Sequence, residues 1–254
     1  MSKRKCEGEE ERENEKKCRI EYDGYDEYRV LKGNPYNVSS QKPYYVLWRS
    51  FLKREERKNL FNQCMPGGSL NIKWETQNMP IPGGGMAPLP RKTAFLSPIE
   101  NLCFKYSNME SYAQLMPPEI KTIMDQVGKQ VGEEFNAVFM NLYENGSHYI
   151  GFHRDSESGI HGGMVKNSKI ASLSLGATRR FVLLHSMHKT KPGNSKIKKE
   201  RHERGEYFCI SLDAGTLFLM GPFMQEWWHH SIMKEPESKH TRPRINMTFR
   251  KFVI

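Results

Sequence analysis

Apolar residues recur along the chain with two different periods, and each period predicts one kind of element. Between residues 117 and 135, five of them fall on one face of an amphipathic helix, at i, i+3, i+4, i+7 and i+11. They are Ile120, Ile123, Met124, Val127 and Val131. From residue 136 onward the apolar residues form short runs separated by turn signals, a pattern typical of strands. The eight runs are FNAVFMNLY, YIGFHRD, KIASLSLG, RRFVLLH, YFCISLD, GTLFLMG, WWHHSIM and RINMTFRKFVI.

Eight short strands in succession predict a double-sheet jelly roll, or double-stranded β-helix, in a chain of α+β class. Residues 43–64 predict an apolar strand that leads into a short helix, and the Pro- and Gly-rich residues 79–96 predict strands joined by turns. Residues 1–34 lack apolar periodicity and predict a disordered, charged tail. The predicted organisation is a tail (1–34), an amino-terminal extension with the support helix (35–135) and the jelly-roll core (136–254).

The composition narrows the class of protein. No apolar run approaches the ~20 residues of a membrane span, and the amino terminus has no hydrophobic signal region. Five cysteines without a CxxC pair indicate neither a disulfide framework nor a zinc knuckle, which fits a reducing compartment. We expect a monomer with no membrane partner.

Half of the net charge of +10 falls in residues 189–204, which hold seven Lys or Arg against two Glu. Two interpretations stay open: a solvated, mobile loop, or a contact for a polyanion, since cations that neutralise phosphates release counterions and raise affinity. In the second, a nucleic-acid backbone would contact Lys196, Lys198, Lys199 and Arg201. The KRK and KKCR clusters in residues 3–19 have the spacing of a bipartite nuclear-import signal, which predicts a nuclear location, with the cytoplasm as the alternative.

The last strand carries an unusual row of polar side chains. Because side chains in a strand alternate faces, every second residue from Arg244 to Arg250 lies on one face. That row is Arg244, Asn246, Thr248 and Arg250, and the opposite row is Ile245, Met247 and Phe249. The apolar row is explained as core. Two cations, an amide and a hydroxyl on the other face predict an anionic ligand.

A metal site is predicted from histidines on two separate strands. In HRD, His153 and Asp155 share one face of a strand, while WWHHSIM offers His229 and His230, of which only one can point inward. Two histidines and one carboxylate on a small β-barrel form the facial triad of non-haem Fe(II) oxygenases. Zinc is the alternative metal, but a zinc site would leave the terminal arginines unexplained.

An Fe(II) oxygenase of this kind uses a co-substrate that chelates the metal, and the usual one, 2-oxoglutarate, carries a carboxylate at each end. Arg244 and Arg250 are bidentate donors suited to carboxylates. Asn141 and Tyr143 form a second same-face polar pair on the strand MNLY. The predicted cofactor and co-substrate are therefore Fe(II) and 2-oxoglutarate.

Four segments resemble the successive motifs of the AlkB family of Fe(II)/2-oxoglutarate dioxygenases, over about residue 44 to the carboxy terminus. They are NLYENGSHYIGFHRDSES, IASLSLGATRRF, WWHHSI and RINMTFR. PLPRKTAFL also resembles the eukaryotic DNA-repair branch of that family. The resemblance implies oxidative demethylation of 1-methyladenine and 3-methylcytosine in DNA, with release of formaldehyde, succinate and carbon dioxide.

The resemblance also implies roles for individual residues around the metal. It makes His153, Asp155 and His230 the iron ligands, with His229 as a neighbour. Arg244 with Tyr143 would bind the distal carboxylate of 2-oxoglutarate. Arg250 with Asn141 would hold the end that chelates iron, and Asn246 belongs to the same polar row.

On the substrate side, the resemblance places a nucleotide-recognition segment in the amino-terminal extension. Phe104 and Tyr106 would stack on a flipped-out base, and Glu157 would accept a hydrogen bond from its exocyclic amine. Relatives often have acids at both positions after HxD, whereas this chain has Ser156, so the preferred base stays open. Residues 79–86, MPIPGGGM, form either an apolar wedge for opening a duplex or a plain flexible loop.

Two other functions fit parts of the same pattern. An RNA demethylase would use the same chemistry on a single-stranded substrate. A non-catalytic nucleic-acid-binding module would keep the barrel without turnover, but the complete triad and both arginines argue against that interpretation.

Overall fold

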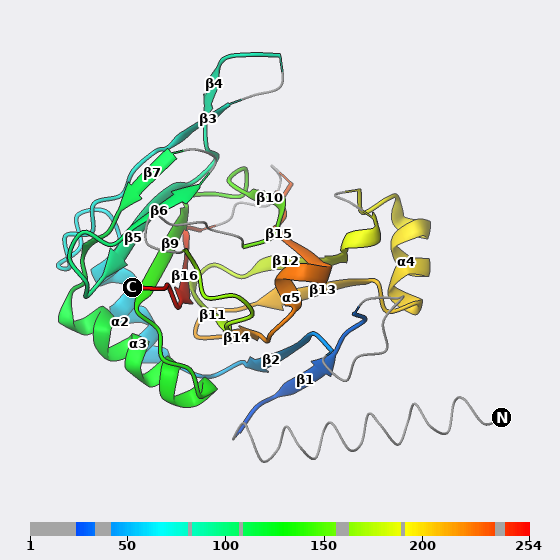
Figure 1. Cartoon of the computed structure of the whole chain (residues 1–254), viewed down its shortest axis with the longest axis horizontal. Helices are drawn as coiled ribbons and strands as arrows, with labels where there is room; N and C mark the ends of the chain where they lie inside the picture. The colour runs from blue at the N-terminus through cyan, green and yellow to red at the C-terminus, as the bar shows by residue number, and fades with distance from the viewer. Residues whose placement is uncertain are drawn as a thin grey trace.

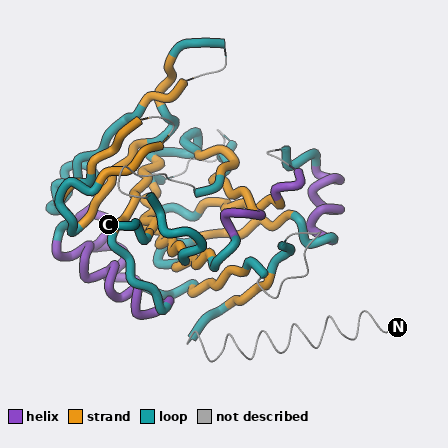
Figure 2. The backbone as a smooth tube through the Cα atoms, viewed as in Figure 1, coloured by secondary structure: helices purple, strands orange, loops and turns teal. Residues whose placement is uncertain are grey.

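The structure of the protein is a computed structural model that describes residues 24–33, 42–80, 83–106, 109–155, 163–188, 191–236 and 242–254. Strands fill the middle of the molecule, and the three longest helices lie at its left and right margins (Figure 2). The predictions for residues 1–23, including the import signal, and for Ser156 and Glu157 lie outside the described residues. None of the described helices is long and apolar enough to span a bilayer.

The larger main sheet has eight strands, with the carboxy-terminal strand near its centre. Their order is β1 (Glu27–Val30), β2 (Tyr44–Trp48), β14 (Leu217–Met220), β11 (Ile170–Gly176), β16 (Arg244–Arg250), β9 (Ala137–Tyr143), β5 (Lys92–Ser97) and β8 (Gln114–Leu115). β16 runs antiparallel to both β11 and β9, so Asn246 lies opposite Ser174 and Asn141, and Arg244 lies opposite Tyr143. Polar residues of three strands therefore meet on one face of the sheet.

The smaller main sheet carries both histidines of the predicted metal site. Its order is β10 (Ile150–His153), β15 (Trp228–Ile232), β12 (Arg179–His185) and β13 (Tyr207–Leu212). Two further pairs of strands form two-stranded sheets: β3 (Asn78–Pro80) with β4 (Met86–Pro88), and β6 (Cys103–Tyr106) with β7 (Met109–Tyr112). The β3–β4 hairpin projects from the body of the molecule (Figure 1).

Hydrophobic layers cover both faces of the large sheet. On the outer face, α2 (Arg54–Cys64) and α3 (Pro118–Val131) pack against residues such as Leu173 and Met247 (Figure 1). On the inner face, Phe218 and other large-sheet residues share a core with Phe181 and Trp228 of the small sheet. The two sheets therefore face each other across a shared core, and the pocket described below lies between them.

The helix predicted from the apolar periodicity is present as α3. Its residues Ile120, Met124, Val127 and Val131 are buried, and Ile123 packs partly buried against the same core. Pro118 lies in the first turn, where its missing N–H has no helical partner to lose. Gly132 ends the helix with φ of 62°, a left-handed conformation that glycine adopts without a Cβ clash.

All eight strands predicted from residue 136 onward are present, as β9 to β16. β2 and α2 confirm the predicted strand and helix of residues 43–64, and β3, β4 and β5 contribute to the predicted strands of residues 79–96. The prediction of a disordered tail is wrong for residues 24–33, because β1 pairs with β2 along its whole length. The Trp228 indole also donates a hydrogen bond to the Lys32 carbonyl at 2.9 Å. Partners distant in sequence thus order this segment.

The basic segment predicted as a loop contains a helix, α4 (Ser195–Glu203). Asn194 caps this helix, because its side chain accepts a hydrogen bond from the Ile197 backbone N–H at 3.0 Å. Pro192 and Gly193 precede the helix and so do not interrupt it. The loop prediction is therefore wrong for residues 195–203. Two shorter helices, η1 (Ser186–His188) and α5 (Met224–Trp227), lie in other connections.

The carboxylate of Glu206, just beyond α4, anchors the end of that helix. It accepts hydrogen bonds from Lys32 at 3.1 Å and Arg204 at 3.0 Å, and His188 Nε2 lies 3.0 Å away. Burial opposes ionisation of this side chain, but these three partners outweigh burial and lower the pKa of Glu206 to about 2. Glu206 therefore ties α4 to the segment that follows β1.

We expect Glu206→Gln to lower the free energy of unfolding by roughly 1–2 kcal/mol near neutral pH, a discounted value because Lys32 and Arg204 are half exposed. The folded pKa of about 2 lies below the ordinary value of 4.5, so this contribution is full above the ordinary value and is lost as the pH falls toward 2. Urea titrations of both proteins at several pH values measure the difference. A difference of constant size across that pH window would contradict the assignment.

Candidate active site

Three of the four residues in the polar row of β16 border a pocket between the two sheets, and Arg244 is not among the residues that line it. Asn246, Thr248 and Arg250 border the pocket together with Asn141 and Tyr143 of β9. The alternate residues of β16 are fully buried in the core on the outer face: Ile245, Met247 and Phe249. The alternation predicted for this strand is confirmed.

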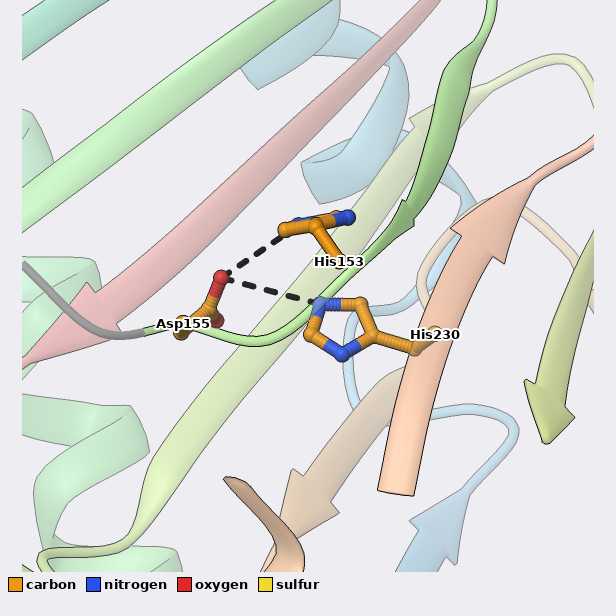
Figure 3. Close-up of side chains that lie close together, drawn as sticks. All are labelled: His153, Asp155 and His230. Atoms are coloured by element: carbon orange, nitrogen blue, oxygen red, sulfur yellow. Dashed lines mark ion pairs between the residues drawn. The ribbon is translucent and has the colours of Figure 1, made fainter. Parts of the chain in front are cut away.

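Three predicted site residues converge at the same pocket (Figure 3). His153, Asp155 and His230 each offer one ligand atom, and these atoms lie within 4.8 Å of one another. The Nε2 atoms of His153 and His230 are 3.4 Å and 3.6 Å from Asp155 Oδ1. Antiparallel pairing of β10 with β15 sets the two histidines directly opposite each other. The sheet register therefore brings the two histidines of the cluster together.

Local hydrogen bonds orient two members of this cluster. His153 Nδ1 lies 2.9 Å from the Gly151 carbonyl oxygen, and a donor at Nδ1 leaves Nε2 free to bind a metal. β10 ends at His153, so Asp155 lies just beyond the strand that the sequence predicted to include it. The Asp155 backbone N–H donates to Gln225 Oε1 at 2.8 Å, which fixes the main chain at Asp155 after the strand ends. Gln225, on α5, has no signal in the HRD motif and was missed by sequence reasoning.

The electrostatics of the cluster suit metal binding. Burial opposes ionisation of Asp155, but Arg250, 3.1 Å from its Oδ1, and the two histidines hold its pKa well below the usual range. For His230, burial and the neighbouring His153 lower the pKa to about 4. The His230 imidazole is therefore neutral near pH 7, which is the form that binds a metal. Two imidazoles and one carboxylate are the donor set of the Fe(II) facial triad.

The structure decides between the two adjacent histidines of β15. His230 borders the pocket and is 6% exposed, whereas His229 lies on the other side of the strand, opposite Leu184 of β12. His229 Nδ1 is buried, and it has no hydrogen-bond partner within the described ranges. The geometry therefore selects His230 as the third member of the cluster.

Arg244 is fully buried beside Tyr143 at the base of the polar row. Its Nη2 donates to Ser174 Oγ at 2.9 Å and to Asn246 Oδ1 at 2.8 Å, while Nε and Nη1 have no hydrogen-bond partner among the described residues. Burial lowers its pKa to about 10, so the guanidinium stays charged at neutral pH. A buried cation without an anion is costly. The unsatisfied N–H groups therefore fit a carboxylate supplied from outside the chain.

A comparison with known families decides what this pocket belongs to. The family model of the 2OG-Fe(II) oxygenase superfamily matches residues 45–250, which include the three clustered residues and both arginines. The chain belongs to the 2OG-Fe(II) oxygenase superfamily. The donor set of the cluster fits Fe(II), and the Arg244 guanidinium fits a carboxylate of 2-oxoglutarate, the co-substrate in that name.

AlkB homologues are among the proteins similar to this chain. It is 32% identical to DNA oxidative demethylase ALKBH2 of Mus musculus over 166 residues, 65% of this chain and 63% of the relative. It is 33% identical to the Arabidopsis thaliana ALKBH2 over 171 residues, 63% of this chain and 52% of that protein. With the alpha-ketoglutarate-dependent dioxygenase alkB homolog 3 of Homo sapiens, it shares 33% identity over 138 residues, 52% of this chain and 42% of the relative.

The chain thus spans less than two thirds of the length of each of these curated relatives. Among solved structures, that of OsALKBH1 has 16% identity and a TM-score of 0.49, and the match covers 84% of this chain and 99% of that one. The curated relatives confirm the resemblance to the AlkB family that the motifs indicate.

Several residues that border the pocket were missed by sequence reasoning. Arg91, just before β5, is 6% exposed, and its Nε donates to Asn141 Oδ1 at 2.7 Å. Arg91 belongs to PLPRKTAFL, and the resemblance of that segment to the AlkB family could have indicated that Arg91 lies near the site. Gln77 precedes β3 and carries no such signal. The apolar lining is Phe139, Ile150, Phe181, Met220 and Ile232.

The predicted base-stacking residues lie on a hairpin. Phe104 and Tyr106 belong to β6, which pairs with β7, and their side chains lie outside the described part of the structure. The stacking role of this pair therefore stays a prediction, as does the role of Glu157.

The four predicted backbone-binding cations all lie on α4, and none of them borders the pocket. They differ in availability: Lys196 and Lys199 are exposed, whereas Lys198 and Arg201 are half-buried. Arg201 also donates a hydrogen bond to the Lys191 carbonyl. Only two of the four cations therefore extend freely from the helix.

Proposed function

We propose that this chain is an Fe(II)- and 2-oxoglutarate-dependent demethylase that removes N-linked methyl groups from nucleobases in DNA, with 1-methyladenine and 3-methylcytosine as substrates. The proposal rests on the position of the metal-binding cluster beside the strand that carries a buried cation. The His153–Asp155–His230 cluster borders the same pocket as the strand that holds Arg244, a buried cation without an acid partner among the described residues. Similarity to proteins named DNA oxidative demethylase ALKBH2 supports DNA as the substrate class.

When bound, Fe(II) with 2-oxoglutarate and dioxygen supplies the oxidation of a methyl group, and the products are succinate, carbon dioxide and formaldehyde. The chain itself contributes positions and charges. Arg244 and Tyr143 would bind the distal carboxylate, and Arg250 and Asn141 would hold the end nearer the metal. Asn246 accepts a hydrogen bond from Arg244 and would keep that guanidinium in place.

We infer that the two main sheets form a double-stranded β-helix with residues 136–254 as its core. The extension over residues 35–135 would carry the nucleotide-recognition segment. Three of its strands, β2, β5 and β8, belong to the same large sheet as four strands of the core, which supports folding as one unit. We also propose that the protein is a monomer and that it acts in the nucleus.

A base within a duplex has to leave the stack before it can enter such a pocket. Phe104 and Tyr106 would stack on the flipped base, His153 would form the opposite wall, and Glu157 would accept a hydrogen bond from the exocyclic amine. The projecting β3–β4 hairpin (Figure 1), with Met86 57% exposed at its end, supports an apolar wedge that opens the duplex.

Binding of duplex DNA should depend on the exposed lysines of α4. We expect Lys196→Ala combined with Lys199→Ala to flatten the slope of log K against log salt by about 1.8, because each phosphate contact contributes about 0.9. Fluorescence anisotropy with a duplex at several salt concentrations measures that slope. Turnover on a short single-stranded oligonucleotide should fall less, since the pocket is untouched.

The matched control removes the same charge from another helix. Arg54→Ala combined with Lys58→Ala changes two exposed cations on α2, which Figure 1 places at the opposite side of the molecule from α4. Its salt slope should stay near that of the unmodified protein. Equal slopes in the two double variants would mean that α4 does not bind the DNA backbone.

An RNA demethylase is the second candidate, because the pocket chemistry would be the same. Paired oligonucleotides separate the two: a single 1-methyladenine or 3-methylcytosine in duplex DNA, in single-stranded DNA and in RNA of the same sequence. With Fe(II), 2-oxoglutarate and air, mass spectrometry should show faster loss of the methyl group from DNA. Faster conversion of RNA would favour the RNA demethylase. Binding of the oligonucleotides without any loss of the methyl group would favour a non-catalytic nucleic-acid-binding module.

A further inference from the structure

One fully buried arginine in the small sheet, Arg179, is not explained by the metal site or by the predicted co-substrate contacts. It begins β12 and is 1% exposed. Its guanidinium donates to three main-chain carbonyls: Asn145 at 3.2 Å, His148 at 2.7 Å and Met233 at 2.6 Å. A planar group with donors in a fixed fork suits three acceptors at set positions, and a lysine ammonium would not reproduce that geometry.

The three carbonyls come from the ends of the strands that carry the site. Asn145 and His148 lie in the connection between β9, which bears Asn141 and Tyr143, and β10, which bears His153. Met233 directly follows β15, which bears His230. One side chain therefore ties together the ends of three strands that supply pocket residues.

Arg179 also contacts the ring of Tyr143. Its Cζ atom lies 5.6 Å from the ring centroid, and the Cζ atom of Arg244 lies 5.4 Å from the same centroid. Tyr143 itself is 1% exposed and borders the pocket. Two guanidinium groups thus hold one aromatic ring, and cation–π contacts strengthen when the partners are shielded from water.

We propose that Arg179 is a positioning residue for the co-substrate: it fixes Tyr143, and through Tyr143 the wall that receives the distal carboxylate. This inference rests on the proposed use of 2-oxoglutarate. Arg179 would not touch the metal, so its replacement should weaken 2-oxoglutarate binding without weakening metal binding. A merely structural arginine would instead affect stability alone.

The test is a double-mutant cycle on binding, with Mn(II) in place of Fe(II) and without turnover. Calorimetry gives the 2-oxoglutarate affinity of the unmodified protein, Arg179→Lys, Tyr143→Phe and the double variant. We expect Arg179→Lys to weaken 2-oxoglutarate binding by about 10-fold, within the range for residues coupled in one network, and to leave the Mn(II) affinity unchanged. The double variant should bind no more weakly than Tyr143→Phe alone, because the hydroxyl that Arg179 positions is already absent.

The adjacent residue of β12 provides the control. Arg180 is 47% exposed and pairs with Glu235 at 3.2 Å, so Arg180→Lys should leave 2-oxoglutarate affinity unchanged. If Arg179→Lys does not fold, Arg179→Gln, which keeps a donor for the carbonyls, replaces it in the cycle. Additive losses, or a lower melting temperature with unchanged affinity, would overturn the positioning role. Failure of the unmodified protein to bind 2-oxoglutarate would instead contradict the proposed function.

Discussion

Replacing Asp155 by Asn should reduce both iron binding and succinate formation at least ~100-fold. Mutation of a residue that only hydrogen-bonds to a metal ligand already lowers metal affinity or activity by about 10–100-fold, and Asp155 is itself a predicted ligand. Asp155 is the one anionic member of the cluster, and both histidine Nε2 atoms lie within 3.6 Å of its Oδ1. An amide keeps the shape of the side chain but removes the charge that offsets Arg250 and a divalent metal. Metal content by mass spectrometry and succinate by chromatography measure the two losses.

The variant has to be shown to be folded, because Asp155 is buried against Arg250 at 3.1 Å and breaking such a pair is destabilising. Circular dichroism provides that check. The matched histidine pair sharpens the result: His230→Ala should lose iron, whereas His229→Ala, on the opposite side of β15, should retain much of it. An iron-loaded and active His230→Ala variant would overturn the assignment of the cluster.

Replacing Arg244 by Ala should raise the 2-oxoglutarate concentration needed for half-maximal activity at least ~10-fold, because losing a charged partner of a desolvated carboxylate costs roughly 2–5 kcal/mol. Arg244 is fully buried, and the described residues supply hydrogen-bond acceptors to its Nη2 but none to its Nε and Nη1. Metal binding should be retained, since Arg244 does not contact the cluster. Initial rates across a range of 2-oxoglutarate concentrations measure the effect.

Arg242→Ala serves as the control for that prediction. Arg242 lies two residues earlier on the same segment but is exposed, so its removal changes the same charge and leaves the buried guanidinium beside Tyr143 in place. Its 2-oxoglutarate dependence should match that of the unmodified protein. Unchanged dependence in Arg244→Ala would mean that the polar row of β16 serves some other anion.

The parts of the site that the sequence predicts are those governed by local periodicity. Period-two alternation assigns Arg244 and Arg250 to one face of β16, and the structure places them so. Helical periodicity likewise predicts the buried face of α3. The clustering of His153 with His230 needs a strand pairing that periodicity does not give, and the resemblance to the AlkB family supplies it.

The features that the sequence does not predict depend on partners far along the chain. β1 has only four residues, and it is ordered by its pairing with β2 and by the Trp228 hydrogen bond to Lys32. In the sequence, Arg179 is indistinguishable from a surface cation on a strand. Its three carbonyl partners come from connections that only the fold brings together. α4 is a different case, because its signal was local: Asn194 before a run of strong helix formers is a capping pattern that the charge of the segment concealed.

The pocket should couple oxidation of 2-oxoglutarate to removal of a methyl group from a nucleobase. The most direct test incubates the Fe(II)-loaded protein in air with 2-oxoglutarate and duplex DNA that carries a single 1-methyladenine. Succinate, formaldehyde and unmodified adenine should then appear in equal amounts, and Asp155→Asn should produce none of them. Succinate without formaldehyde or restored adenine would contradict this coupling, because the oxidation would then proceed without demethylation of the base.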